Sequence, residues 1–104
     1  MANFLCVVYN GGRFTGCDAR VDENGIEITI FLSISYYKLH RDQIIKIIKF
    51  NNNRKMFRIE FNKGTIKNEL VDLKIVRKKK FANLIETMGY TVETREYYER
   101  ALSY

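Results

Sequence analysis

The chain has 104 residues, of which 46% are hydrophobic and 29% are charged, and its formal net charge is +6. This composition predicts one globular domain over residues 1–104 and excludes an intrinsically disordered chain. No apolar run approaches the ~20 residues that cross a bilayer, and the first residues lack the pattern of a secretory signal, so we expect a cytoplasmic protein.

Strand patterns begin near the start of the chain. The apolar runs Phe4–Tyr9 and Phe14–Val21 flank an Asn-Gly-Gly turn and are predicted strands. A hairpin turn is predicted at Asp22–Gly25, because Asn-Gly readily takes the positive φ that such turns need. The apolar residues after it recur with the period of two that is typical of a half-buried strand: Ile26, Ile28, Ile30 and Leu32.

Four further strands are predicted in the middle of the chain. Ser35–Leu39 carries two β-favouring tyrosines, and Ile44–Phe50 is read as a strand in preference to a helix because it contains four isoleucines. Lys55–Asn62 alternates cleanly, and a strand at Thr65–Leu70 follows a Lys-Gly turn. In Lys55–Asn62 the residues expected to face the core are Phe57, Ile59 and Phe61.

The pattern changes to a helical period near the C-terminal end. We expect an amphipathic helix with Asp72 as its N-cap and Gly89 just past its end, where Tyr90 can contact the last turn. Its apolar stripe is Leu73, Val76, Phe81, Leu84, Ile85 and Met88. A second, short helix is predicted over residues 94–102. Its face of Tyr97, Tyr98 and Leu102 is expected either to pack on the sheet or to contact a partner, including a second copy of the chain.

Together these elements predict an α+β fold. It consists of a mainly antiparallel, curved β-sheet of about six or seven strands, closed by the C-terminal amphipathic helix and followed by the short second helix. The order of elements resembles the pleckstrin-homology-like superfold, including its GRAM and bacterial members, over residues 14–89. The features that carry the resemblance are Phe14 and Gly16 in the first matched strand, the Asn24-Gly25 turn, the tyrosine-containing strand, the short turn at His40–Gln43 and the closing helix.

That resemblance implies a binding module without catalysis. Lipid-binding pleckstrin domains carry basic residues in the loop between their first two strands, whereas this chain has Asp22 and Glu23 there. The departure argues against phosphoinositide binding.

Positive charge is concentrated in residues 36–80, which hold fourteen basic and four acidic residues, a net charge of +10; the segments on either side are each at −2. Such a concentration attracts polyanions. The candidate partner-binding residues are Lys46, Lys49, Arg54, Lys55, Arg58, Arg77, Lys78, Lys79 and Lys80, with Tyr36 and Tyr37 as aromatic contacts.

No constellation of an enzyme is recognisable in the sequence. Gly11 and Gly16 have the spacing of a phosphate-binding loop, but Cys17-Asp18 stands where Lys-Ser/Thr must follow. His40 is the only histidine, and Asp42 two residues on cannot by itself orient it as a base for a nucleophile. Cys6 and Cys17 could pair on neighbouring strands or bind a soft metal with His40, but three candidate ligands without close spacing make a weak case for a metal site. We expect both thiols to be reduced and packed. We therefore expect no catalytic residue, no metal and no cofactor.

The leading hypothesis is a non-catalytic interaction module that docks an acidic protein partner, as a small phage-type inhibitor would. The alternative is sequence-independent binding of nucleic acid by the same basic face. A further alternative, attachment to an anionic membrane surface, is disfavoured because no lipidation motif is present. The identity of a partner does not follow from the sequence.

Overall fold

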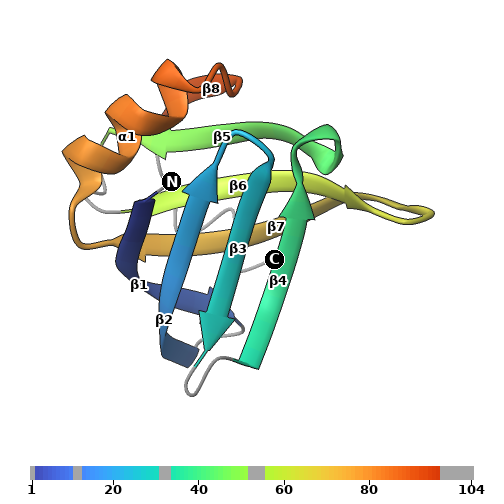
Figure 1. Ribbon diagram of the computed structural model, residues 1–104, viewed down its shortest axis with the longest axis horizontal. Helices are drawn as coiled ribbons and strands as arrows, with labels where there is room; N and C mark the ends of the chain where they lie inside the picture. The colour runs from blue at the N-terminus through green and yellow to red at the C-terminus, as the bar shows by residue number, and fades with distance from the viewer. Residues whose placement is uncertain (1, 11–12, 31–33, 52–55, 97–104) are drawn as a thin grey trace.

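The computed structural model describes residues 2–10, 13–30, 34–51 and 56–96 (Figure 1). Over these residues the chain forms strands, one 3₁₀ turn and one α-helix. The strands are β1 Ala2–Asn10, β2 Arg13–Asp22, β3 Gly25–Ile30, β4 Ile34–His40, β5 Ile44–Phe50, β6 Met56–Lys63, β7 Ile66–Ile75 and β8 Val92–Arg95. The 3₁₀ turn η1 spans Arg41–Gln43 and helix α1 spans Lys78–Thr87.

The strands form a single sheet in the order β4-β3-β2-β1-β7-β6-β5-β8. All neighbours are antiparallel except β5 and β8, which are parallel. The sheet curves back on itself, so that β2, β3 and β4 lie in front of β5, β6 and β7 and cross them at a steep angle (Figure 1). Strand β1 joins the two halves because it pairs with both β2 and β7.

The core lies between the two halves of the sheet. The alternation predicted for β6 is confirmed, since Phe57, Ile59 and Phe61 are buried. In β3, Ile26 and Ile28 are buried as predicted and Ile30 is partly buried against the core, while Leu32 lies outside the described residues. Helix α1 closes one end of this core with Phe81, Ala82 and Ile85. The Phe81 ring makes edge-to-face contacts with Phe4 and Phe57, at centroid distances of 5.3 and 4.8 Å.

The predicted fold class is wrong. Over the described residues the molecule is predominantly an eight-stranded mixed sheet with one short α-helix, and that helix is followed by a further strand. The chain continues from α1 into β8, where the predicted second helix was to begin. Tyr97, Tyr98 and Leu102, the expected face of that helix, lie outside the described residues.

Backbone hydrogen bonds explain why residues 92–95 form a strand. The edge of β5 that faces away from β6 carries backbone N–H and C=O groups that β8 can pair with. There the Ile47 N–H donates to the Thr91 carbonyl at 2.8 Å. The Asn51 N–H donates to the Arg95 carbonyl at 2.9 Å. A helix this short is marginal in water, whereas a strand at a sheet edge gains ladder hydrogen bonds at once.

The predicted start of the C-terminal helix is also wrong. Asp72 is not an N-cap but a residue of β7, directly opposite Arg58 of β6. Leu73 is a fully buried strand residue, and Val76 is exposed in the turn before α1. The residue before the helix is Arg77, which makes no side-chain capping hydrogen bond. Strand pairing therefore overrides the local capping preference of the aspartate.

The predicted end of the helix is confirmed. Gly89 has a φ of +82°, which glycine adopts without strain. The Gly89 N–H donates to the Glu86 carbonyl and the Tyr90 N–H to the Ile85 carbonyl, both at 3.0 Å. This hydrogen-bond pair is a Schellman motif, and it fixes the direction in which the chain leaves α1 for β8.

The Asp22–Gly25 turn is present as predicted. Asp22 and Gly25 are paired across β2 and β3, and the Asp22 carboxylate accepts hydrogen bonds from the Asn24 and Gly25 N–H groups at 2.8 and 3.1 Å. A Cβ atom at Gly25 would collide with the Leu39 carbonyl oxygen of β4. Glycine is thus required here by a close approach of the backbone.

Cys6 and Cys17 form a disulfide. They are direct partners in the register of β1 and β2, and their Cα atoms lie 5.2 Å apart, within the usual range for a disulfide. The expectation of reduced thiols, which followed from the expected cytoplasmic setting, is therefore wrong, and the pairing on neighbouring strands that the sequence also allowed is the one observed. In the described part of the chain, no helix is long and apolar enough to cross a membrane.

Candidate functional site

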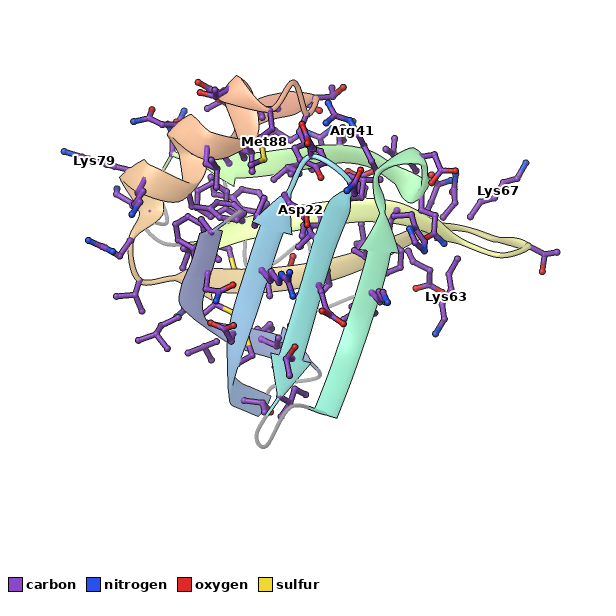
Figure 2. The ribbon with its side chains drawn as sticks, in the orientation of Figure 1. Asp22, Arg41, Lys63, Lys67, Lys79 and Met88 are labelled. Carbon is purple, nitrogen blue, oxygen red and sulfur yellow. A yellow bond between two sulfur atoms is a disulfide. The ribbon has the colours of Figure 1, made fainter. Side chains whose placement is uncertain are left out.

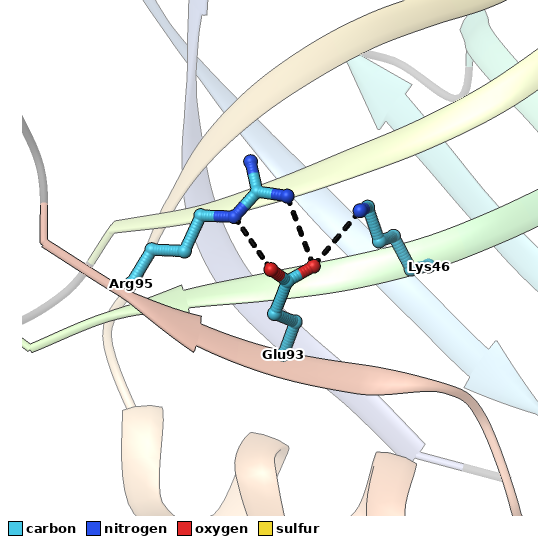
Figure 3. Close-up of polar contacts among 3 residues, drawn as sticks. All are labelled: Lys46, Glu93 and Arg95. Carbon is cyan, nitrogen blue, oxygen red and sulfur yellow. Dashed lines mark hydrogen bonds and ion pairs between the residues drawn. The ribbon is translucent and has the colours of Figure 1, made fainter.

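Two of the predicted binding cations are held by carboxylates. Lys46 Nζ lies 2.8 Å from a carboxylate oxygen of Glu93, which also accepts hydrogen bonds from Arg95 at 2.7 and 3.0 Å (Figure 3). The hydrogen bonds from Arg95, and then from Lys46, lower the pKa of Glu93 to about 2. The ion pair between Lys46 and Glu93 thus links β5 to β8, and Arg95 of β8 holds the Glu93 carboxylate in place.

Arg58 is held more tightly. Its Nε and Nη2 donate to both Asp72 carboxylate oxygens at 2.7 and 3.1 Å, and the two side chains are only 14% and 12% exposed. The guanidinium also lies 5.4 Å from the centre of the Phe50 ring. Arg58 is therefore a structural residue that links β6 to β7 and is not free to bind an external anion.

Three other predicted residues meet at one place in the fold. Lys49 lies near the end of β5, and Lys78 and Lys79 lie in the first turn of α1. They line a pocket of about 230 Å³ together with Phe50, Asn51, Met56, Phe57 and Ala82. We call this the lysine pocket.

The packing of α1 creates the lysine pocket. Lys49 is the register partner of Phe57, so both belong to the part of the sheet that α1 covers. Contact between the rings of Phe57 and Phe81 holds the helix over this part of the sheet. The first turn of α1 therefore lies beside the end of β5, although the two are distant in sequence.

The apolar residues that line the lysine pocket expose little surface. Phe57, Met56 and Phe50 are only 2%, 3% and 6% exposed, and Met56 and Phe50 form a small cluster with Ile48 on the other side of the sheet from the main core. The sequence placed Met56 on the non-core face but gave no sign that it would be buried. The lining residues Ala82 and Asn51 were not predicted, because only the packing of α1 reveals them.

The start of α1 is unusually positive. Its first turn contains no acidic residue and begins with three consecutive lysines. A helix N-terminus carries partial positive charge, so each cation near it costs about 0.3–1 kcal/mol. The first backbone hydrogen bond of the helix runs from the Phe81 N–H to the Arg77 carbonyl at 3.0 Å. An anion bound here would offset this repulsion.

The remaining predicted residues are dispersed. Arg77 and Lys80 are exposed at the start of α1. The Tyr37 ring is half-buried and packs on Phe61, with centroids 5.5 Å apart. The side chain of Tyr36 and residues Arg54 and Lys55 lie outside the part of the chain that the structure describes.

A second pocket of about 250 Å³ lies over β2, β3 and β4. Its ionisable lining residues are of both signs: Arg20, Lys38 and His40 against Asp22 and Glu27. This mixture gives no preference for either sign of ligand charge. Within the described ranges, no group of three or more histidine, cysteine or acidic side chains could hold a metal ion.

No family model matches the sequence, and no curated protein is similar to it. One solved structure of similar fold is the C-terminal domain of an unknown protein from Leishmania infantum. It has a TM-score of 0.68 and 13% identity, and the match covers 85% of this chain and 82% of that one. At this identity the likeness shows the fold alone, so function has to be argued from the site. The resemblance to the pleckstrin-homology-like superfold is not tested by these comparisons and stays a prediction.

Proposed function

We propose that the protein is a non-catalytic binding module whose lysine pocket docks an acidic surface of another protein. One observation carries the proposal. Lys49, Lys78 and Lys79 converge on one pocket and make no ion pair with any residue that the structure describes. Lys78 and Lys79 lie at a helix start that has no acidic residue to balance it.

The size of the lysine pocket supports a protein as the ligand. Pockets that enclose whole small molecules measure about 300–1,000 Å³. At about 230 Å³ the lysine pocket is smaller and suits one or two side chains of a larger partner. The sequence suggested a small inhibitor, and such a protein would act by covering the acidic surface of its partner.

Nucleic acid is the weaker alternative. Binding of single strands draws much of its affinity from bases stacked on exposed aromatic rings. The aromatic residues of the pocket, Phe50 and Phe57, are only 6% and 2% exposed, so neither offers a ring face to a base. Nucleic acid would therefore be bound through its phosphates alone. A membrane surface would likewise be bound by electrostatic attraction alone.

Two other expectations remain predictions. A homodimer through the C-terminal face would involve Tyr97, Tyr98 and Leu102, which lie outside the described residues. The cytoplasmic setting is weakened by the Cys6–Cys17 disulfide, because cytosolic proteins usually keep their thiols reduced.

The test compares two double charge reversals that change the net charge equally. K78E/K79E alters the lysine pocket, whereas K63E/K67E alters the β6–β7 hairpin at the opposite end of the molecule (Figure 2). Poly-L-glutamate is the probe for an acidic protein surface. A single-stranded oligonucleotide of matched charge is the probe for the alternative ligand, nucleic acid. We expect K78E/K79E to weaken binding of poly-L-glutamate by about tenfold or more, equivalent to about 1.4 kcal/mol, and K63E/K67E to have a much smaller effect.

Equal losses in the two variants would mean that binding follows net charge alone, which would overturn the proposal. Tighter binding of the oligonucleotide than of poly-L-glutamate by the wild-type chain would favour the alternative. Melting curves of both variants serve as the folding control.

A further inference from the structure

We propose that the docking surface for the acidic partner continues from the lysine pocket to an exposed apolar patch, formed by Leu5 of β1 and Val76 of the turn before α1. The partner that fits both is an acidic protein surface on which aliphatic or aromatic side chains stand among the carboxylates. This inference rests on the proposed function and adds the apolar part of the interface.

Leu5 and Val76 form a continuous apolar area in water. They are the most exposed large hydrophobic side chains of the described residues, at 69% and 55%. The Val76 N–H donates to the Leu5 carbonyl at 3.1 Å, one step beyond the register pair Cys6 and Ile75. Cys6 and Ile75 are buried in the core, so the positions next to them face outward. Single exposed apolar side chains are common on protein surfaces, whereas neighbouring ones mark contact sites.

The apolar area continues along β1. Val7 lies two residues after Leu5, on the same face of the strand, and is half-buried. Its partner in β2 is Gly16, which is exposed and has no atom of the described residues within 4 Å of the position that a Cβ would take. The sheet is therefore uncovered beside Val7, and another protein surface can approach it closely.

The cations beside the patch determine the charge of the partner. Arg77 follows Val76, and Lys80 lies three positions further, on the same side of the first helical turn. Both are exposed, and neither makes an ion pair with a residue that the structure describes. An acidic residue, Asp18, lies opposite Leu5 on the β2 side, away from α1. The side of the patch next to α1 therefore attracts carboxylates.

Net charge favours an acidic partner over a second copy of the chain. Each copy carries a formal net charge of +6, so two copies repel each other. An acidic protein is attracted by the same charge.

The area that an interface needs links the patch to the lysine pocket. A stable interface covers about 800 Å² on each partner, far more than a pocket that takes one or two side chains. Lys78 and Lys79 line the pocket, and Val76 lies two residues before them in the chain. Figure 1 shows β1 and the end of β7 beside the turn that leads into α1. One partner can thus contact the pocket and the patch, in the combination of apolar and charged contacts that is typical of interfaces.

The test uses two acidic peptides of equal length and charge, built from the repeats Glu-Glu-Leu and Glu-Glu-Ser. L5N/V76T alters the patch, whereas L70N/I45T removes two apolar side chains elsewhere on the sheet that are 45% and 38% exposed. We expect the wild-type chain and L70N/I45T to bind the leucine peptide about tenfold more tightly than the serine peptide. L5N/V76T should bind both peptides equally. Fluorescence anisotropy of labelled peptides gives the affinities, and melting curves confirm that the variants fold.

The outcomes separate this inference from the proposed function. Equal binding of the two peptides by the wild-type chain, or a preference that L5N/V76T retains, would overturn the inference. If K78E/K79E then still loses binding of the serine peptide, the proposed function stands. Failure of the wild-type chain to bind either peptide at millimolar concentration would overturn both.

Two further measurements address the other occupants of the patch. Vesicles of phosphatidylcholine and phosphatidylserine test a membrane, and sedimentation of the wild-type chain tests a second copy. Without a peptide preference in the wild-type chain, vesicle binding or dimerisation that L5N/V76T abolishes would assign the patch to that occupant and overturn the inference.

Discussion

Arg41 of η1 donates a hydrogen bond of 2.6 Å from Nη2 to the carbonyl oxygen of Met88, at the end of α1 (Figure 2). Its Nη1 donates to the Glu23 carbonyl at 3.1 Å, and its guanidinium lies 4.6 Å from the centre of the Tyr90 ring. The Tyr90 hydroxyl in turn donates to the Asp22 carbonyl at 2.7 Å. One cation of the basic segment thus joins the β2–β3 turn to the helix whose other end forms the lysine pocket.

Loss of this link should destabilise the fold. R41A removes charge-assisted hydrogen bonds to two carbonyl groups, and we expect a loss of about 2 kcal/mol in the free energy of unfolding. R41K keeps the charge but cannot reach both carbonyls with one planar group, so it should recover only part of the loss. Urea unfolding of the three chains gives the comparison. Wild-type stability in R41A would contradict the role assigned to Arg41.

The Arg58–Asp72 pair gives a second stability prediction. R58M alone leaves the Asp72 carboxylate without its partner in a site where it is 12% exposed, and should cost about 3 kcal/mol. The double variant R58M/D72L replaces both charges with apolar groups and should recover most of that loss. Thermal melts of the single and double variants measure the difference. A double variant no more stable than R58M would show that the pair does not act as a unit.

Reduction of the disulfide should also lower stability. Cys6 and Cys17 are separated by 11 positions, and closing a loop of this length is worth about 2–3 kcal/mol through the unfolded chain. A domain of this size loses about 4–8 °C in melting temperature for each kcal/mol. Melting curves with and without reductant, with C6A/C17A as the control that reductant should not affect, test this. A wild-type curve that does not move with reductant would contradict it.

Acid should weaken the contact between β8 and β5. Hydrogen bonds from Arg95 and Lys46 lower the pKa of Glu93 from 4.5 to about 2. Because the pKa of the folded state is the lower one, the ionised carboxylate stabilises the fold above pH 4.5, and this contribution is lost as the pH falls toward 2.

In E93Q this part of the acid dependence should be absent, and the variant should be less stable than wild type at neutral pH. Chemical denaturation across the acid range measures both effects. The same loss of stability on acidification in both chains would exclude Glu93 as its source.

Local signals predicted the features that depend on neighbours in sequence. The alternation around Ile59 identified β6, the Asn24-Gly25 pair identified a turn, and Gly89 identified the end of α1. Each of these depends on backbone conformation or on a two-residue period, both of which are visible in a short window.

Features that depend on distant partners were missed. Asp72 suits a helix N-cap and a cross-strand ion pair equally well, and only the pairing of β6 with β7 decides between them. The same holds for Lys46, a predicted binding residue, because its ion pair with Glu93 depends on the pairing of β5 with the distant strand β8. Lys49 was predicted as a partner-binding residue, but its meeting with Lys78 and Lys79 follows from the packing of α1 on β5 and β6.

The most direct test of the central claim is a chemical-shift map of the ¹⁵N-labelled wild-type chain titrated with poly-L-glutamate. We predict that the largest changes fall on residues 49–51, 56–57 and 78–82, which line or adjoin the lysine pocket, and that they diminish as salt rises. Largest changes in the Lys63–Lys67 hairpin, or changes spread evenly over all basic residues, would contradict the assignment of the binding site to the lysine pocket.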